Sequence, residues 1–117
     1  MARHTLQRLQ DIAENINLIE QLVSRTTLPE LQRDRISSAA LERFLAIVSE
    51  ASRHLPPDLT NRFQQVPWRR IADLGNVLRH AYQHIDPGIL WDISRTQLPA
   101  LKVVVTEMIQ VLNKEAP

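Results

Sequence analysis

Residues 67–87 read PWRRIADLGNVLRHAYQHIDP, and this stretch decides both the fold class and the place where chemistry can occur. At 100° per residue its apolar side chains fall on one stripe, at spacings of three and four, which predicts an amphipathic helix. Pro67 suits the start of that helix, and Asp86-Pro87 suits a break followed by a new helix. The predicted apolar stripe consists of Trp68, Ile71, Leu74, Leu78, Ala81 and Ile85.

The opposite face of this helix collects polar side chains. Residues at i, i+4, i+7 and i+11 share one side of a helix, and here they are Arg69, Asp73, Asn76 and His80. Gly75, Arg79 and Tyr82 are expected on a flank between the two faces. If the sequence shows a functional site, it lies on this helix.

Two helices are predicted before this stretch. From about residue 5 to 25 apolar residues repeat at spacings of three and four, which is typical of a helix packed along its whole length. Thr27 and Glu30 have the spacing of a capping box. From about residue 34 to 54 a second helix is predicted, and Pro56-Pro57 ends it. The expected buried residues are Leu9, Ile12, Ile16, Ile19 and Val23 in the first helix, and Ile36, Ala40, Phe44, Ile47, Val48, Ala51 and Leu55 in the second.

Two further helices are predicted after it. Asp86-Pro87-Gly88 can cap a segment that ends near Gln97, and Pro99 can lie in the first turn of a last helix. The buried stripe expected on that last helix is Leu101, Val104, Val105, Met108, Ile109 and Leu112. The chain is therefore predicted to be all-α. Four or five helices with short connections indicate an antiparallel bundle, and residues 1–117 are expected to form one domain.

Composition excludes several classes of protein. The 117 residues contain no cysteine, which excludes disulfides and thiolate metal sites, and no apolar run approaches the roughly 20 residues that span a bilayer. The amino terminus lacks the apolar region of a signal peptide, so a cytoplasmic location is expected. The net charge is +1, but twelve of the fourteen basic residues are arginine, whose planar fork suits phosphate or carboxylate. A solvated arginine-rich surface is the simpler alternative.

Metal chemistry and the common hydrolase motifs find little support. His80 and His84 lie at i, i+4, and Asp73 or Asp86 could join them, but the Glu-x-x-His pairs of a bundle di-metal site are missing. The two glycines belong to no phosphate-binding loop, and no nucleophile elbow is present. No metal and no cofactor are predicted.

A histidine beside an arginine and an asparagine remains. Asn76 and His80 are one helical turn apart. A histidine can take a proton from a ribose 2′-hydroxyl or give one to a leaving oxygen, and an arginine can hold the phosphate charge that builds up. These groups suffice for metal-independent RNA cleavage, although such a set is more often an ordinary solvated surface.

The run PWRRIADLGNVLRHAYQHIDPGILWDI resembles the signature segment of the HEPN superfamily, in its HepT-like branch, and weaker similarity covers nearly the whole chain from about Leu6. The resemblance implies a helical homodimer whose motif helices face each other across a shared cleft. It also implies a ribonuclease toxin paired with a small nucleotidyltransferase antitoxin, which adenylylates the tyrosine of the motif in some systems.

Residue by residue, the resemblance assigns the polar position to Asn76, the catalytic histidine to His80 and the modifiable tyrosine to Tyr82. The motif arginine is missing, because Asp73, Leu74 and Gly75 occupy its place. Helical side chains lean toward the amino terminus, so we expect Arg79 to reach back over Gly75 and replace it.

The alternative is a catalytically inactive module that binds a nucleotidyltransferase. In that case Gly75 would allow close approach of the partner helix in the dimer. Seven arginines are candidate contacts for the RNA backbone, with Arg69 and Arg70 the best because they lie on the motif helix; the set is Arg33, Arg35, Arg43, Arg53, Arg62, Arg69 and Arg70.

Overall fold

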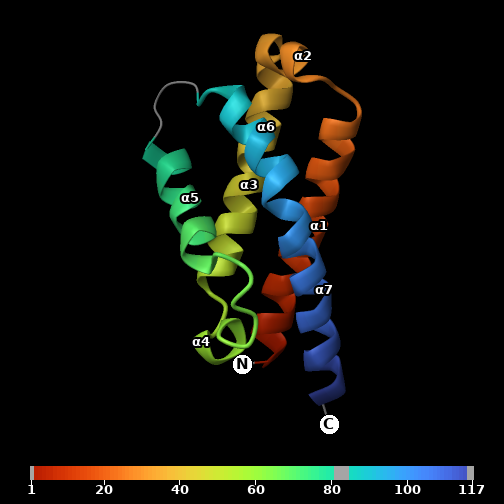
Figure 1. Ribbon diagram of the computed structural model, residues 1–117, viewed down its shortest axis with the longest axis vertical. Coiled ribbons are helices and arrows are strands. Elements are labelled where there is room, and N and C mark those ends of the chain that lie inside the picture. The colour runs from red at the N-terminus through yellow and green to blue at the C-terminus, as the bar shows by residue number, and fades with distance from the viewer. Residues whose placement is uncertain (1, 81–84, 116–117) are drawn as a thin grey trace.

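The computed structural model describes residues 2–80 and 85–115, and these form seven helices (Figure 1). Five of them have ten residues or more, in agreement with the predicted all-α bundle. The helices are α1 (Ala2–Ser24), α2 (Leu28–Arg33), α3 (Arg35–Arg53), α4 (Pro57–Thr60), α5 (Trp68–His80), α6 (Pro87–Thr96) and α7 (Leu98–Glu115).

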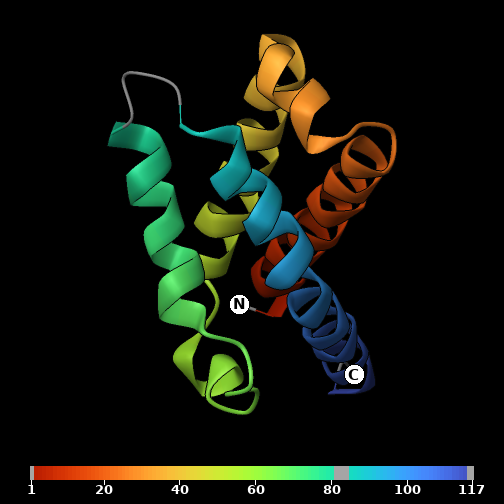
Figure 2. The same ribbon diagram turned by 45° about the horizontal axis from the view of Figure 1, so that its top comes forward.

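The long helices run up and down the longest axis of the molecule (Figure 1). α1 ascends, α3 descends beside it, α5 ascends along the other side of α3, and α6 leads into α7, which descends to the carboxyl end. Figure 2 shows the same order from another direction, with α5 on one side of α3 and α1 on the other. Direct contacts join α3 to both α1 and α5, so α3 is the central helix.

The core lies mainly between α1, α3 and α7. Four of the five residues predicted for the first helix are fully buried, and Val23 is partly buried. In α7 the predicted stripe also packs inward, with Leu101, Val104, Val105 and Met108 buried. Burial of a leucine or isoleucine side chain contributes roughly 1.5–3 kcal/mol, so these two stripes supply much of the driving force for folding.

The predicted face of α3 is wrong at its amino-terminal end. Ile36 is 83% exposed, and the inward face is centred on Leu41, Leu45 and Val48 instead. Three serines share that face: Ser38, Ser49 and Ser52. Each hydroxyl donates to a backbone carbonyl, which offsets the cost of burying a polar group. A prediction that counts only apolar residues misses these buried serines. It therefore assigns the wrong side of α3 as the inward face.

The predicted caps are largely confirmed. The Thr27 side chain accepts a hydrogen bond from the Glu30 N–H, and Asp86 accepts one from Gly88 at the start of α6. The returning half of the capping box differs, because the Glu30 carboxylate contacts Thr26 instead of the cap residue. Asp34 adds a cap for α3, accepting from the Ile36 and Ser37 N–H groups, and the hydroxyl of Ser37 lowers its pKa.

Helix α5 is shorter at its carboxyl end than the predicted helix. Ile85 and Asp86 are not helical, so the stripe does not continue to Ile85 as expected, although Ile85 still packs on the core. Ala81 and Tyr82 lie outside the described residues, as does His84.

Candidate functional site

The amino-terminal end of α5 is fixed by the loop before it. The Pro67 carbonyl accepts the first helical hydrogen bond, from Ile71, at 3.1 Å. The Trp68 indole donates to the Phe63 carbonyl at 2.9 Å, so the large ring ties the start of the helix to the loop. The helix start predicted at Pro67 is therefore confirmed, since Pro67 directly precedes α5 and its carbonyl accepts the first bond of the helix.

A buried hydroxyl joins α5 to α3. Ser49 is fully buried, and its Oγ lies 2.7 Å from the Ile71 carbonyl oxygen and 2.8 Å from the Gly75 nitrogen. Residues 71 and 75 are the two ends of one helical rung, so the hydroxyl donates to one end and accepts from the other. A Cβ at position 75 would lie 2.8 Å from this oxygen, which is closer than such atoms approach.

This contact corrects one alternative drawn from the sequence. Gly75 does allow close approach of another helix, but the helix is α3 of the same chain, where Ser49 occupies the space. Gly75 is buried, whereas the sequence pattern predicts a position on a flank between the two faces. The glycine is therefore needed within the fold itself.

The side chain of Arg79 lies back over Gly75, as expected. Its Nη1 is 3.5 Å from the position that a Cβ of residue 75 would take. The same nitrogen donates to Oε2 of Glu50 at 3.3 Å, and Nη2 donates to Oδ1 of Asn76. Contacts from two helices thus hold the guanidinium beside the position of the missing motif arginine.

A second arginine reaches the same asparagine. Nη1 of Arg53, at the end of α3, lies 3.5 Å from Oδ1 of Asn76, so this one oxygen accepts from two guanidinium groups. Nothing in the sequence distinguishes Arg53 from the six other candidate arginines. Sequence reasoning does not single out Glu50 at all, because that residue lies on a different helix from the motif. The i, i+4 spacing of Glu50 and His54 is the signal that could have found it.

Glu50 is the acidic centre of this group. Its Oε1 lies 3.1 Å from Nε2 of His54, and its Oε2 contacts Arg79. The hydrogen bond from His54, followed by the positive charges of Arg53, His54 and Arg79, holds the pKa of Glu50 below its usual value, although partial desolvation opposes this. The carboxylate therefore remains charged and keeps its hold on Arg79.

Asn76 and His80 share an exposed face of α5, as predicted, and Arg69 lies exposed on the same helix. Arg70 lies elsewhere. It lines a largely apolar groove of about 280 Å³ between α5 and α6, with Leu74, Val77, Ile89 and other residues. The two arginines that the sequence pairs as RNA contacts, Arg69 and Arg70, therefore do not both lie on the face of α5 that carries Asn76 and His80. Tyr82, the predicted modification site, lies outside the described residues.

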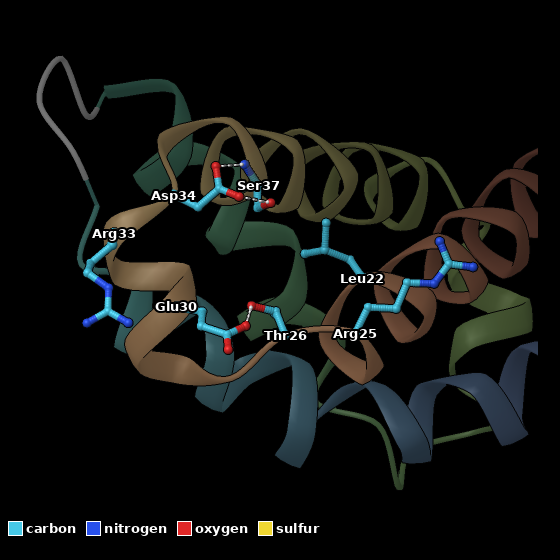
Figure 3. Close-up of a pocket in the computed structure, with 7 residues that line it drawn as sticks. All are labelled: Leu22, Arg25, Thr26, Glu30, Arg33, Asp34 and Ser37. Carbon is cyan, nitrogen blue, oxygen red and sulfur yellow. Dashed lines mark hydrogen bonds between the residues drawn. The ribbon is translucent and has the colours of Figure 1, made fainter.

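Another hollow lies where α1, α2 and α3 meet (Figure 3). It measures about 430 Å³, but its polar groups already serve the helix ends: Thr26 bonds to Glu30, and Asp34 bonds to Ser37. Figure 3 shows the guanidinium groups of Arg25 and Arg33 pointing to opposite sides. The hollow is thus lined by capping groups and has no converging reactive set.

Two negative findings concern the described residues alone. No group of three or more histidine or acidic side chains among them is placed to hold a metal ion. None of their helices combines the length and the apolar character needed to cross a bilayer.

Comparison with known proteins gives a family. The model of the family "Ribonuclease HepT-like" matches residues 12–108. The "Probable ribonuclease HepT" of Thermococcus cleftensis is 34% identical over 102 residues, covering 87% of this chain and 93% of that protein. A protein of Methanocaldococcus jannaschii named as a candidate RNase, MJ0127, is 34% identical over 107 residues, covering 92% of this chain and 88% of that protein. No solved structure matches. The chain belongs to the HepT-like ribonuclease family of the HEPN superfamily.

Proposed function

We propose that this chain is a metal-independent endoribonuclease and the toxin of a toxin–antitoxin pair, acting in the cytoplasm as one domain. The observation that supports it best is the position of Arg79. Its guanidinium lies over Gly75 and contacts Asn76. The next residue along the helix is the exposed His80. A phosphate-binding cation and a proton-transfer group therefore occur together although the motif arginine is absent.

The proposed reaction is transesterification within the RNA strand. His80 takes the proton of a ribose 2′-hydroxyl, the O2′–P bond forms, and the P–O5′ bond breaks. The departing O5′ receives a proton from a protonated histidine or from water, so the products are a 2′,3′-cyclic phosphate and a free 5′-hydroxyl. Arg79 stabilises the charge on the phosphate oxygens as the bonds exchange, a role for which a fixed guanidinium fork is suited.

A homodimer through α5 is part of the proposal. Val77 is 59% exposed and Ile89 is 55% exposed, and both line the apolar groove between α5 and α6. Exposed apolar side chains grouped beside a groove favour burial against another surface. A two-fold axis near α5 would bring two copies of His80 and Arg79 to one cleft, and one histidine could then serve as base while the other serves as acid.

The proposed regulator is a nucleotidyltransferase antitoxin that attaches AMP to Tyr82. The added phosphate would place negative charge two residues beyond His80 and compete with RNA for the arginines. Tyr82→Phe should leave RNA cleavage intact and make it insensitive to the antitoxin with ATP. If the Tyr82→Phe protein is still silenced and labelled with AMP, the assignment of the tyrosine is wrong.

The decisive experiment is cleavage of an end-labelled single-stranded RNA in the presence of EDTA. His80→Ala and Arg79→Ala should each lower the rate about 10²- to 10⁴-fold, the range for loss of a general acid–base or of a transition-state contact. His4→Ala and Arg95→Ala replace exposed residues of the same types on other helices and serve as matched controls.

Two outcomes would count against this function. Full activity of Arg79→Ala would mean that Arg79 has not replaced the motif arginine. No cleavage by the wild-type protein would favour the alternative, in which the chain binds a nucleotidyltransferase without cutting RNA, and co-purification with that partner would be the next measurement.

A further inference from the structure

Two guanidinium groups from different helices converge on one amide oxygen. Arg79 donates to Oδ1 of Asn76 from α5, and Arg53 approaches the same atom from the end of α3, at 3.5 Å. Like charges at such short range repel, and an exposed arginine has many other rotamers available to it. Their convergence marks a place where an anion would be held from two sides.

The charges around this point do not cancel. Within the described residues, the carboxylate that the cluster contacts is that of Glu50, which pairs with Arg79 and also accepts from His54. Two arginines against one carboxylate leave one positive charge, and a protonated His54 would add to it. A phosphodiester carries one negative charge, and its two free oxygens can each take a bond from a guanidinium fork.

We propose that Arg53 and Arg79 together bind one phosphodiester of the RNA strand. The identity of the ligand as RNA rests on the proposed function; the pairing of the two arginines rests on their shared contact with Asn76. Before RNA binds, Asn76 and Glu50 hold the forks at the position the phosphate takes. Arg53 is then a substrate-binding residue supplied by α3, a helix that the motif does not include.

The placement of Arg53 agrees with a role in binding more than with one in stability. Its contact with Asn76 is at the long end of the hydrogen-bond range, and both side chains are exposed. Exposed pairs of this kind contribute little to folding. Arg53→Ala should therefore leave the melting temperature nearly unchanged, so that any loss of RNA binding can be read directly.

The test measures RNA binding without turnover. His80→Ala protein is titrated onto a fluorescein-labelled single-stranded RNA, and anisotropy is followed at several salt concentrations. Adding Arg53→Ala should weaken binding about ten-fold or more, and each lost phosphate contact should reduce the salt slope by about 0.7. The double variant with Arg79→Ala should lose less than the product of the two single effects, because both residues hold the same phosphate.

The matched control is Arg25→Ala, an exposed arginine that lies beside Asp34 and Ser37 at the other end of α3. Ser37 and Arg53 are sixteen residues apart, about 24 Å along the helix, so binding should change less than two-fold. Arg53→Lys, which keeps the charge without the fork, should recover only part of the affinity. Equal losses for Arg53→Ala and Arg25→Ala, or strictly independent effects of Arg53 and Arg79, would overturn the proposal.

The binding of one phosphodiester by Arg53 and Arg79 and the nuclease function are tested by different outcomes. If RNA binding depends jointly on Arg53 and Arg79 while the wild-type protein cuts no RNA, the nuclease function is wrong and the binding role of the two arginines is supported. If the wild-type protein cuts RNA and Arg53→Ala binds and cuts it normally, the nuclease function is supported and the joint binding role is wrong. If no variant binds RNA, the joint binding role is wrong, and the wild-type cleavage assay tests the nuclease function independently.

Discussion

Helix α3 contacts α1 on one side and α5 on the other, and these two seams are built from different chemistry. Its buried side chains Leu41, Leu45 and Val48 join the same apolar core as the buried isoleucines and leucine of α1, which α3 contacts. Toward α5 it presents the hydroxyl of Ser49 and, nearer the surface, Glu50 and Arg53. The first seam depends on apolar area, which many side chains can supply. The second depends on the position of individual atoms, and it adjoins the residues proposed to bind RNA.

The largest effect is expected in the apolar seam. Leu45→Ala should lower the free energy of unfolding by about 2–5 kcal/mol, because Leu45 is fully buried and its removal leaves a cavity. Urea denaturation followed by circular dichroism measures this directly. Ile36→Ala, on the same helix but exposed, is the control and should change stability by less than about 0.5 kcal/mol. Comparable losses for the two variants would mean that the inward face of α3 is wrongly assigned.

At the contact between α3 and α5, the effect of Gly75→Ala on stability should change sign according to whether residue 49 is serine or alanine. In Gly75→Ala the new Cβ displaces the Ser49 hydroxyl, at a cost of about 1–3 kcal/mol for the broken contacts, while alanine regains about 1 kcal/mol of helix propensity. A net loss of about 1 kcal/mol is expected. In a Ser49→Ala background the nearest atoms are the Cβ of residue 49 and Nη1 of Arg79, both at an ordinary contact distance of 3.5 Å, so Gly75→Ala should stabilise by about 1 kcal/mol.

The double-mutant cycle of these variants measures the coupling. Stabilisation by Gly75→Ala in both backgrounds would show that the Ser49 hydroxyl does not restrict position 75. The contact between α3 and α5 would then tolerate a side chain at position 75, and the Ser49 hydroxyl would not explain why the motif arginine is missing there.

A smaller effect should depend on pH. Because the pKa of Glu50 is lowered in the folded protein, chiefly by the hydrogen bond from His54, its contribution is fully present above the unfolded pKa. That contribution is lost as the pH falls through the folded pKa. Glu50→Gln should therefore be less stable than wild type near neutrality, and the two should converge in acid. Denaturation series from pH 7 to pH 3 provide the comparison, and a difference that grows in acid would contradict the assignment.

The smallest effect is expected for a charge pair on the surface between α1 and α7. Lys102 and Glu20 join α7 to α1 at 2.8 Å, but both side chains are about half exposed. Lys102→Ala should cost less than about 1 kcal/mol, and the cost should shrink at high salt. Thermal melts in low and high salt can measure it. A loss as large as that of Leu45→Ala would mean that short distance outweighs exposure here.

The apolar seams can be predicted from the sequence because their residues obey one simple rule. Side chains buried along a helix recur every three or four residues, so the cores of α1 and α7 and most of the caps are visible in the sequence alone. The face of α3 is only partly visible, since serine is buried there with its hydroxyl bonded to backbone, and hydropathy does not register such a position.

The candidate site divides in the same way. The placement of Arg79 over Gly75 follows from helical geometry within one element, and the structure agrees with it. The contributions of Glu50 and Arg53 require α3 and α5 to be set side by side with the correct offset, which no local pattern encodes. The spacing of residues within one helix can be read from a short piece of sequence, whereas the pairing of two helices joins residues that are far apart in the sequence.

The hydroxyl of Ser49 also bears on the history of the chain. An arginine at position 75 needs a Cβ that would lie 2.8 Å from the present position of Ser49 Oγ, so a change at one of the two positions is felt at the other. We expect relatives that carry arginine at the equivalent of Gly75 to carry alanine or glycine at the equivalent of Ser49. If Arg79 has taken over from an arginine at position 75, as proposed, the loss of that arginine was coupled to the appearance of the serine at position 49.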